Sequence, residues 1–182
     1  VELRTTPIKT KDFEWNVNLN FTSYKNKIVY LPESRKGTTV DGYRGYTSGN
    51  KFFGEDCSLY TFHLKKYAGI NENGESMWYY NATDENGNTV KKTTTVYDEG
   101  DEYLCGTSLP DAYGGFSTSL TWKGFDLSVD FSYQIGGQVY DGDYAAMMGS
   151  NMRGTNIHKD MLNAWTPTNN SSLPRMQRGD QY

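Results

Sequence analysis

The chain has 182 residues, enough for one domain with a core, and its formal net charge of -4 leaves no basic patch for nucleic acid. Its 19 glycines, 15 tyrosines and 15% aromatic content favour β-structure with many turns. The mean hydropathy of -0.76 and the lack of a run of about 18 apolar residues exclude a transmembrane helix. They do not exclude a transmembrane β-barrel, in which only alternate residues of each strand meet lipid.

The first residues predict a short strand, a turn and a longer strand. Residues 1–6 alternate in polarity before Pro7, and residues 7–12 (PIKTKD) are expected to form a polar turn. Residues 13–21 (FEWNVNLNF) then alternate strictly, with aromatic ends and an aliphatic centre on one face and polar side chains on the other.

The middle of the chain predicts short elements and long loops. In order, we expect an extended segment at 23–31, a long loop at 32–54, a strand at 59–67, a hairpin at 68–80 that turns at Asn73-Gly74, a turn at 84–88, and a β-branched run at 93–97.

The clearest pattern lies in residues 113–137. Two runs with a period of two flank Lys123-Gly124, which predicts a β-hairpin with a two-residue turn. Such a turn places Trp122 opposite Phe125 and thereby fixes every other pair. One face of the hairpin is then apolar, and the other carries Ser and Thr together with Asp126 and Asp130, which would point into a lumen.

Aromatic residues lie at both ends of the apolar face and aliphatic residues between them. Outer-membrane barrels carry such an apolar band between aromatic girdles, on strands of roughly 9–11 residues. We therefore predict an antiparallel all-β meander that forms part of a transmembrane β-barrel, with long extracellular loops and one or two short helices. Ten residues are expected to face lipid: Phe116, Leu120, Trp122, Phe125, Leu127, Val129, Phe131, Trp15, Val17 and Leu19. The alternative is half of a soluble, secreted β-sandwich that binds carbohydrate.

The direction of the strands predicts which side the middle segment occupies. If the strands at 13–21 and 113–122 run in opposite directions, residues 25–110 lie on one side of the membrane. Barrels have short periplasmic turns and long outer loops, so we expect residues 25–110 to be mainly extracellular strand extensions and loops.

The sequence of the C-terminal part predicts two short helical segments. Residues 139–149 are expected to form one or two helical turns. Residues 156–165 (NIHKDMLNAW) are the best helix candidate, with Asn156 as N-cap, Pro167 as a stop and an apolar stripe packed on the barrel rim.

The sequence offers no candidate catalytic, cofactor-binding or metal-binding residues, and we predict that the chain is not an enzyme. His63 and His158 have no neighbour at a metal-ligand spacing, and residues 84–88 (DENGN) lack the spacing of a calcium loop. Cys57 and Cys105 both fall in the segment placed outside the cell, which permits a disulfide between them as a hypothesis. Five aromatic residues are candidates for substrate contact, with loop packing as the competing role: Trp78, Tyr79, Tyr80, Tyr140 and Tyr144.

Four stretches together resemble, in order, the C-terminal part of the barrel in SusC/RagA-type TonB-linked (TonB-dependent) outer-membrane transporters. They are 11–31 (KDFEWNVNLNFTSYKNKIVYL), 58–80 (SLYTFHLKKYAGINENGESMWYY), 110–141 (PDAYGGFSTSLTWKGFDLSVDFSYQIGGQVYD) and 158–167 (HKDMLNAWTP). The resemblance implies a barrel of about 22 strands with an N-terminal plug. It also implies a Gram-negative outer-membrane location, a SusD-like surface lipoprotein as partner, and import of glycan or peptide fragments driven by the TonB complex. Residues 1–182 are then expected to be a barrel fragment without the plug and the closing strands.

Overall fold

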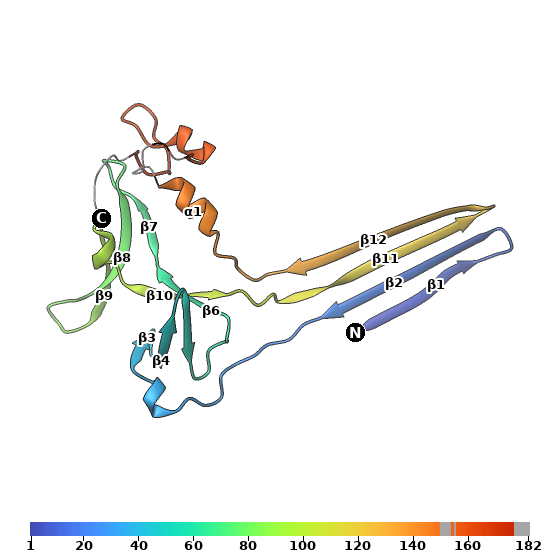
Figure 1. Cartoon of the computed structure of the whole chain (residues 1–182), viewed down its shortest axis with the longest axis horizontal. Helices are drawn as coiled ribbons and strands as arrows, with labels where there is room; N and C mark the ends of the chain where they lie inside the picture. Colours follow the sequence, from blue (N-terminus) through green and yellow to red (C-terminus); the bar gives the residue numbers. More distant parts are fainter. Residues whose placement is uncertain (150–153, 155, 177–182) are drawn as a thin grey trace.

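A computed structural model describes residues 1–149, 154 and 156–176. Within these residues the chain consists of antiparallel strands, one α-helix and three short 3-10 helices. A long sheet extends to one side, and the smaller elements gather at its other end (Figure 1). None of the described helices has the length and apolar character needed to cross a bilayer.

The long sheet has four strands in the order β1-β2-β11-β12. Their bounds are β1 Glu2–Lys9, β2 Phe13–Thr22, β11 Ala112–Trp122 and β12 Phe125–Ile135. The central hairpin has the predicted register, with Trp122 opposite Phe125. Its turn residues Lys123 and Gly124 have φ angles of 47° and 88°, which is the pattern of a type I′ turn. The twist of a type I′ turn matches the twist of the flanking strands, and its two-residue length fixes the register of the hairpin.

The prediction for the N-terminal strand was wrong in one respect. β1 does not stop before Pro7 but continues to Lys9, because a bulge between Thr5 and Ile8 accommodates the proline. The bulge adds one residue to β1, so Ile8 pairs with Trp15. The turn is therefore shorter than predicted and covers residues 10–12.

The prediction of a long loop at 32–54 was also wrong, because this segment contains three strands. They belong to a five-stranded sheet in the order β10-β6-β5-β4-β3. A second small sheet has the order β7-β8-β9. The bounds are β3 Thr38–Val40, β4 Tyr43–Ser48, β5 Lys51–Gly54, β6 Thr61–Lys65, β7 Tyr67–Ile70, β8 Ser76–Thr83, β9 Thr89–Thr94 and β10 Glu102–Thr107.

The five-stranded sheet supplies the small buried core of the molecule. Phe52 is fully buried and packs with Val40 and Cys57, and Leu104 of β10 lies against this cluster. Two 3-10 helices precede strands of this sheet in the sequence: η1 at Glu33–Arg35 comes before β3, and η2 at Tyr97–Glu99 comes before β10 and contacts β8.

The three-stranded sheet confirms two of the predicted turns. The β7–β8 turn has a hydrogen bond from the Gly74 amide to the Asn71 carbonyl oxygen (3.0 Å). In the β8–β9 turn the Asp84 carboxylate accepts hydrogen bonds from the amides of Asn86 and Asn88 (2.9 and 2.7 Å). The predicted β-branched run differs in one respect, because β9 ends at Thr94 and Tyr97 begins η2.

The C-terminal part confirms one helix and corrects the other. Helix α1 (Gly142–Met148) lies inside the predicted range and is capped by the Asp141 carboxylate. Residues 156–165 do not form an α-helix, because only η3 (Lys159–Asn163) is helical and the His158 side chain caps it in place of Asn156. The predicted apolar stripe breaks accordingly: Met161 is buried, whereas Leu162 is 82% exposed.

Candidate functional site

The long sheet has two chemically different faces, and this sheet is the candidate functional site. Residues that pair directly across strands share a face, and successive residues alternate between faces. The register therefore assigns every side chain of β2, β11 and β12 to one of the two faces.

The ten predicted lipid-facing residues all lie on one face. The rungs across β2, β11 and β12 join Trp15 to Leu120 and Leu127, Val17 to Thr118 and Val129, and Leu19 to Phe116 and Phe131. None of the residues that the structure describes covers this apolar face, since Phe125, Leu127 and Phe131 are 75%, 61% and 60% exposed. The sandwich alternative requires a second sheet over these side chains, and none of the sheets of the described residues lies there.

The ends of the apolar face are aromatic. Phe13, Trp122 and Phe125 form the rung next to the turns. At the other end Tyr133 lies opposite Gly114, and its hydroxyl donates a hydrogen bond to the Asn20 carbonyl oxygen (2.8 Å). Because Gly114 has no side chain, the Tyr133 ring can cross β11 and reach β2.

The hydroxyl of Thr118, in the middle of this face on β11, has hydrogen-bond partners. The indole N–H of Trp15 donates to Thr118 Oγ1 (2.8 Å), and Thr118 Oγ1 donates to the Asn16 carbonyl oxygen (3.4 Å). A hydrogen-bonded hydroxyl costs far less to remove from water than a free one. Thr118 is therefore compatible with an apolar environment.

Strand β1 also contributes to the apolar face, which the sequence alone did not predict. Leu3 pairs with Leu19 and Ile8 pairs with Trp15, and both side chains are exposed. The alternation of residues 1–6 was a signal for Leu3. The position of Ile8 depends on the bulge at Pro7, which the sequence alone does not reveal.

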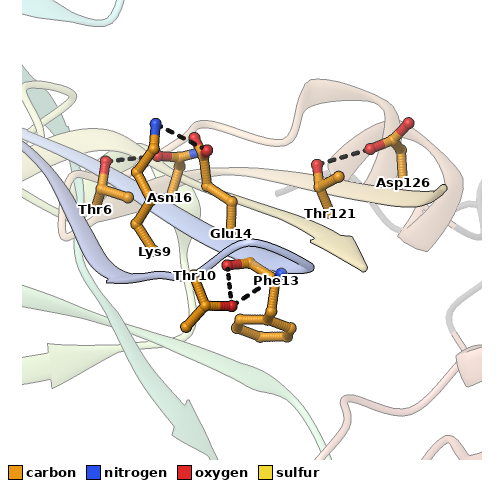
Figure 2. A network of polar contacts seen from close by, with 8 residues as sticks. All are labelled: Thr6, Lys9, Thr10, Phe13, Glu14, Asn16, Thr121 and Asp126. Atoms are coloured by element: carbon orange, nitrogen blue, oxygen red, sulfur yellow. Dashed lines mark hydrogen bonds and ion pairs between the residues drawn. The ribbon is translucent and has the colours of Figure 1, made fainter. Parts of the chain in front are cut away.

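The opposite face is polar and carries a shallow groove of about 440 Å³. The groove is lined mainly by hydroxyl and amide side chains together with Arg4: Thr6, Asn16, Asn18, Ser117, Ser119 and Ser128. Thr6 Oγ1 donates to Asn16 Oδ1 (2.7 Å), and Asn16 Nδ2 donates to Glu14 Oε1 (3.1 Å) (Figure 2). The Asn18 Oδ1 atom is buried and has no hydrogen-bond partner among the described residues.

Acidic and basic groups occur along the whole polar face, and an ion pair and a hydrogen-bonded carboxylate lie near the turns. Lys9 Nζ lies 3.0 Å from Glu14 Oε2, and Thr121 Oγ1 donates to Asp126 Oδ1 (2.7 Å) (Figure 2). Asp126 and Asp130 project to this side of β12, opposite Thr121 and Ser117.

The five candidate substrate-contact residues do not form one cluster of exposed rings. Trp78 packs edge-on between Tyr67 and Tyr97, with ring centroids 5.4 and 5.0 Å away, so it stabilises the β7–β8 region. The Tyr144 hydroxyl donates to Asp160 Oδ2 (3.1 Å) and connects α1 to η3. Tyr140 is 48% exposed, while Tyr79 and Tyr80 are half-buried on β8. Substrate contact by these residues stays a prediction.

The two histidines have structural partners. His63 is buried, with Nδ1 3.2 Å from Glu102 Oε2 on the neighbouring strand β10. His158 caps η3 by accepting a hydrogen bond from the Asp160 amide (3.2 Å). Among residues 1–149, 154 and 156–176, no group of three or more His, Cys, Asp or Glu side chains could hold a metal ion.

The hypothesis of a disulfide is corrected, because Cys57 and Cys105 are both free thiols. Cys57 packs into the core with Phe52, and Leu104 faces this core from β10. Cys105 follows Leu104 on the same strand and so points to the opposite face. Burial raises the pKa of both thiols, which keeps them protonated and weakly nucleophilic.

Comparisons with known proteins agree with this geometry. The chain is 28% identical over 190 aligned residues to TonB-dependent receptor P3 of Formosa agariphila, covering 92% of this chain and 17% of that protein. It is 26% identical over 145 residues to TonB-dependent receptor SusC of Bacteroides thetaiotaomicron, covering 76% of this chain and 14% of that protein. No family model matches the chain.

A solved structure, that of the RagAB peptide transporter, has a chain with the same arrangement. It superposes with a TM-score of 0.77 at 26% identity and covers 99% of this chain and 20% of that one. The chain thus spans a fifth or less of the length of these relatives. The resemblance to SusC/RagA-type TonB-dependent receptors and the fold of a barrel fragment are confirmed.

Proposed function

Because this chain resembles SusC/RagA-type TonB-dependent receptors, we propose that it forms part of the wall of a nutrient importer in a Gram-negative outer membrane. The observation that carries the proposal is the two-faced sheet. An exposed apolar face with aromatic ends suits contact with lipid, and a face of amides, hydroxyls and carboxylates suits a wet lumen. β11 and β12 have 11 residues each, which is enough to cross the hydrocarbon core when tilted.

The proposed orientation places the two short turns in the periplasm and residues 25–110 mainly outside the cell. Three observations support it. β2 and β11 are antiparallel neighbours, the turns after β1 and β11 lie at the same end, and the segment that joins β2 to β11 lies at the other end (Figure 1). Short periplasmic turns and long outer loops are the rule in such barrels.

The proposed partners and cargo follow the relatives. We propose a SusD-like surface lipoprotein as a lid, energy from the TonB complex, and glycan or peptide fragments as cargo. The RagAB transporter is described as a peptide transporter, which supports the peptide option. The two relatives are named as receptors, which supports a role other than catalysis.

A pair of substitutions on one strand tests whether the apolar face meets lipid. Leu120 lies on the apolar face of β11 between Trp15 and Leu127, one rung before the aromatic rung at Trp122, and Ser119 lies next to it on the polar face. Leu120→Arg in the full-length protein should cost about 1–3 kcal/mol, because it places a charge against the hydrocarbon core between the interface and the midplane. Ser119→Arg should cost much less, because it projects into water.

The measurement is the amount of folded protein in purified outer membranes, scored by gel mobility before and after heating. We expect Leu120→Arg to reduce the folded fraction and Ser119→Arg to leave it near the wild-type level. Equal assembly of the two variants would contradict the lipid-facing assignment and, with it, the proposed function.

A further inference from the structure

The C-terminal part of the described chain holds an apolar pocket, which lies between η3 and the residues that follow it. Its volume is about 440 Å³. We call it the Trp165 pocket, after one of the six apolar residues that line it: Met161, Leu162, Ala164, Trp165, Pro167 and Met176. Pockets of this size with a mainly apolar lining are typical of sites that bind small ligands.

The walls of the Trp165 pocket are held by the β7–β8 turn. A Cβ at Gly74 would meet the ring atoms of Trp165, so the indole lies against this glycine. The Arg175 amide donates a hydrogen bond to the Gly74 carbonyl oxygen (2.7 Å), and the Arg175 guanidinium donates one to Glu75 Oε1 (2.9 Å). Two sides of the pocket are thus positioned before a ligand arrives, which lowers the entropic cost of binding.

The same contacts place the pocket relative to the proposed barrel wall. Gly74 and Glu75 belong to residues 25–110, which the proposed orientation puts mainly outside the cell. Because the pocket is fastened to this turn, it belongs to the outer part of the chain, where cargo arrives, and not to the strands that are proposed to span the membrane.

The polar groups at the pocket already have partners. The Arg175 guanidinium forms an ion pair with Glu75, so their charges cancel, and Thr166 Oγ1 accepts a hydrogen bond from the Asn169 amide (3.0 Å). A sugar carries hydroxyls around its ring and needs several free donors and acceptors when it leaves water. This lining instead suits a neutral apolar group.

The pocket has a buried base and an exposed apolar entrance. Met161 and Ala164 are buried, whereas Leu162 is 82% exposed and Met176 is 49% exposed. Covering such exposed surface with a ligand stabilises the complex in proportion to the apolar area that leaves water. Methionine is also flexible, so the lining adapts to apolar groups of different shape.

We propose that the Trp165 pocket binds an apolar side chain of a peptide fragment, aromatic or branched aliphatic, on the outer side of the barrel. The proposal rests on the proposed function, because that function places these residues outside the cell and gives peptide fragments as one class of cargo. It adds a site on this chain and a preference for apolar side chains in the cargo.

The test uses the full-length protein in detergent and two blocked peptides, acetyl-Gly-Gly-Phe-Gly-Gly-amide and the same peptide with Ser in place of Phe. Isothermal titration calorimetry measures the affinity for each peptide. We expect the Phe peptide to bind about ten-fold more tightly than the Ser peptide, because its ring leaves water for the pocket. Leu162→Ser should weaken binding of the Phe peptide about five-fold, because it removes apolar surface at the entrance.

The matched control is Val29→Ser, since Val29 is also 82% exposed and does not line the pocket. This variant should bind the Phe peptide like the wild type. Equal affinity for the two peptides, binding of neither, or equal affinity of the two variants for the Phe peptide would refute the site. The proposed function would then still stand, because assembly of the Leu120 and Ser119 variants in the outer membrane tests it separately. If the protein does not assemble there, the proposed function fails first and this inference fails with it.

Discussion

The long sheet of β1, β2, β11 and β12 and the five-stranded sheet of β10, β6, β5, β4 and β3 place their apolar side chains in opposite ways. In the long sheet a continuous ladder of backbone hydrogen bonds carries large apolar side chains that stay exposed, such as Phe125 and Leu127. In the five-stranded sheet Phe52 is fully buried. The long sheet leaves its apolar side chains available for contact with an apolar environment outside the protein, whereas the five-stranded sheet buries its apolar side chains inside the protein.

The five-stranded sheet has only a small core, and polar contacts supplement it. The Lys36 ammonium, 11% exposed, lies 2.9 Å from Glu33 and 3.1 Å from Glu55. Glu55 also accepts a hydrogen bond from the Leu31 amide (2.8 Å), and this bond together with Lys36 lowers the pKa of the Glu55 carboxyl. Buried apolar contacts and charged contacts thus act together in this part, which suits a segment surrounded by water.

The largest expected effect comes from emptying the core of the five-stranded sheet. Phe52→Ala should destabilise this sheet by about 3–5 kcal/mol, because it removes a fully buried ring and leaves a cavity. The long sheet shares none of these contacts, so assembly in the membrane should persist. Limited proteolysis of intact cells should show faster cleavage within residues 25–110 and no loss of folded barrel.

The neighbouring ring provides the control for that comparison. Phe53 is half-buried and stacks on Tyr46, with ring centroids 5.1 Å apart. Phe53→Ala should therefore accelerate proteolysis less than Phe52→Ala. Loss of the whole barrel on Phe52→Ala would contradict the view that the two parts are stabilised independently.

A loss of stability of intermediate size is expected at Gly114, where β11 lies close to β2 and to the Tyr133 side chain. A Cβ at Gly114 would meet the Asn20 carbonyl oxygen and the Tyr133 hydroxyl. Gly114→Ala should therefore cost about 1–3 kcal/mol and displace the Tyr133 ring. The temperature at which the full-length protein loses its folded gel mobility measures this cost.

Gly115 provides a matched position on the opposite face. A Cβ there would lie 3.1 Å from the Asn20 side-chain amide nitrogen, which can move, and 3.3 Å from a backbone oxygen. Gly115→Ala should lower the transition temperature less than Gly114→Ala. If the two variants behave alike, the contact of Tyr133 across Gly114 does not stabilise the sheet.

The two regions also differ in how far the sequence predicts them. The long hairpin is predictable residue by residue, because a two-residue turn and strict alternation leave one register. Pro7 misleads, because a bulge lets a strand continue through a proline and moves Ile8 to the apolar face. That outcome depends on pairing with β2, which is not a local property of residues 1–12.

The five-stranded sheet is harder to predict, because its strands are short and the contacts that define them are distant in sequence. One local signal was nevertheless present. Asp41-Gly42 joins β3 to β4 with φ angles of 48° and 87°, the same turn geometry that Lys123-Gly124 adopts. By contrast, the burial of Phe52 with Cys57 and Leu104 depends on the tertiary structure, as does the orientation of Cys105 that prevents a disulfide.

The smallest expected effect concerns the β8–β9 turn, whose order depends on one carboxylate. Hydrogen bonds to Asp84, chiefly from the Asn88 amide, lower the pKa of its carboxyl below the ordinary value of 3.8. A carboxyl whose pKa is lower in the folded state stabilises the fold above its unfolded pKa and loses this contribution as the pH falls through the folded value. The turn should therefore loosen below about pH 4 and be unaffected between pH 5 and 8.

Hydrogen exchange of peptides that span residues 76–94, corrected for the intrinsic pH dependence of exchange, measures this loosening. Asp84→Asn keeps a side-chain oxygen that can accept the two amide hydrogen bonds but does not titrate. The variant should therefore exchange at a rate that does not change between pH 6 and pH 3. If it loosens in acid as much as the wild type, the pH dependence arises from another carboxylate, and Asp84 acts only as a hydrogen-bond acceptor in the turn.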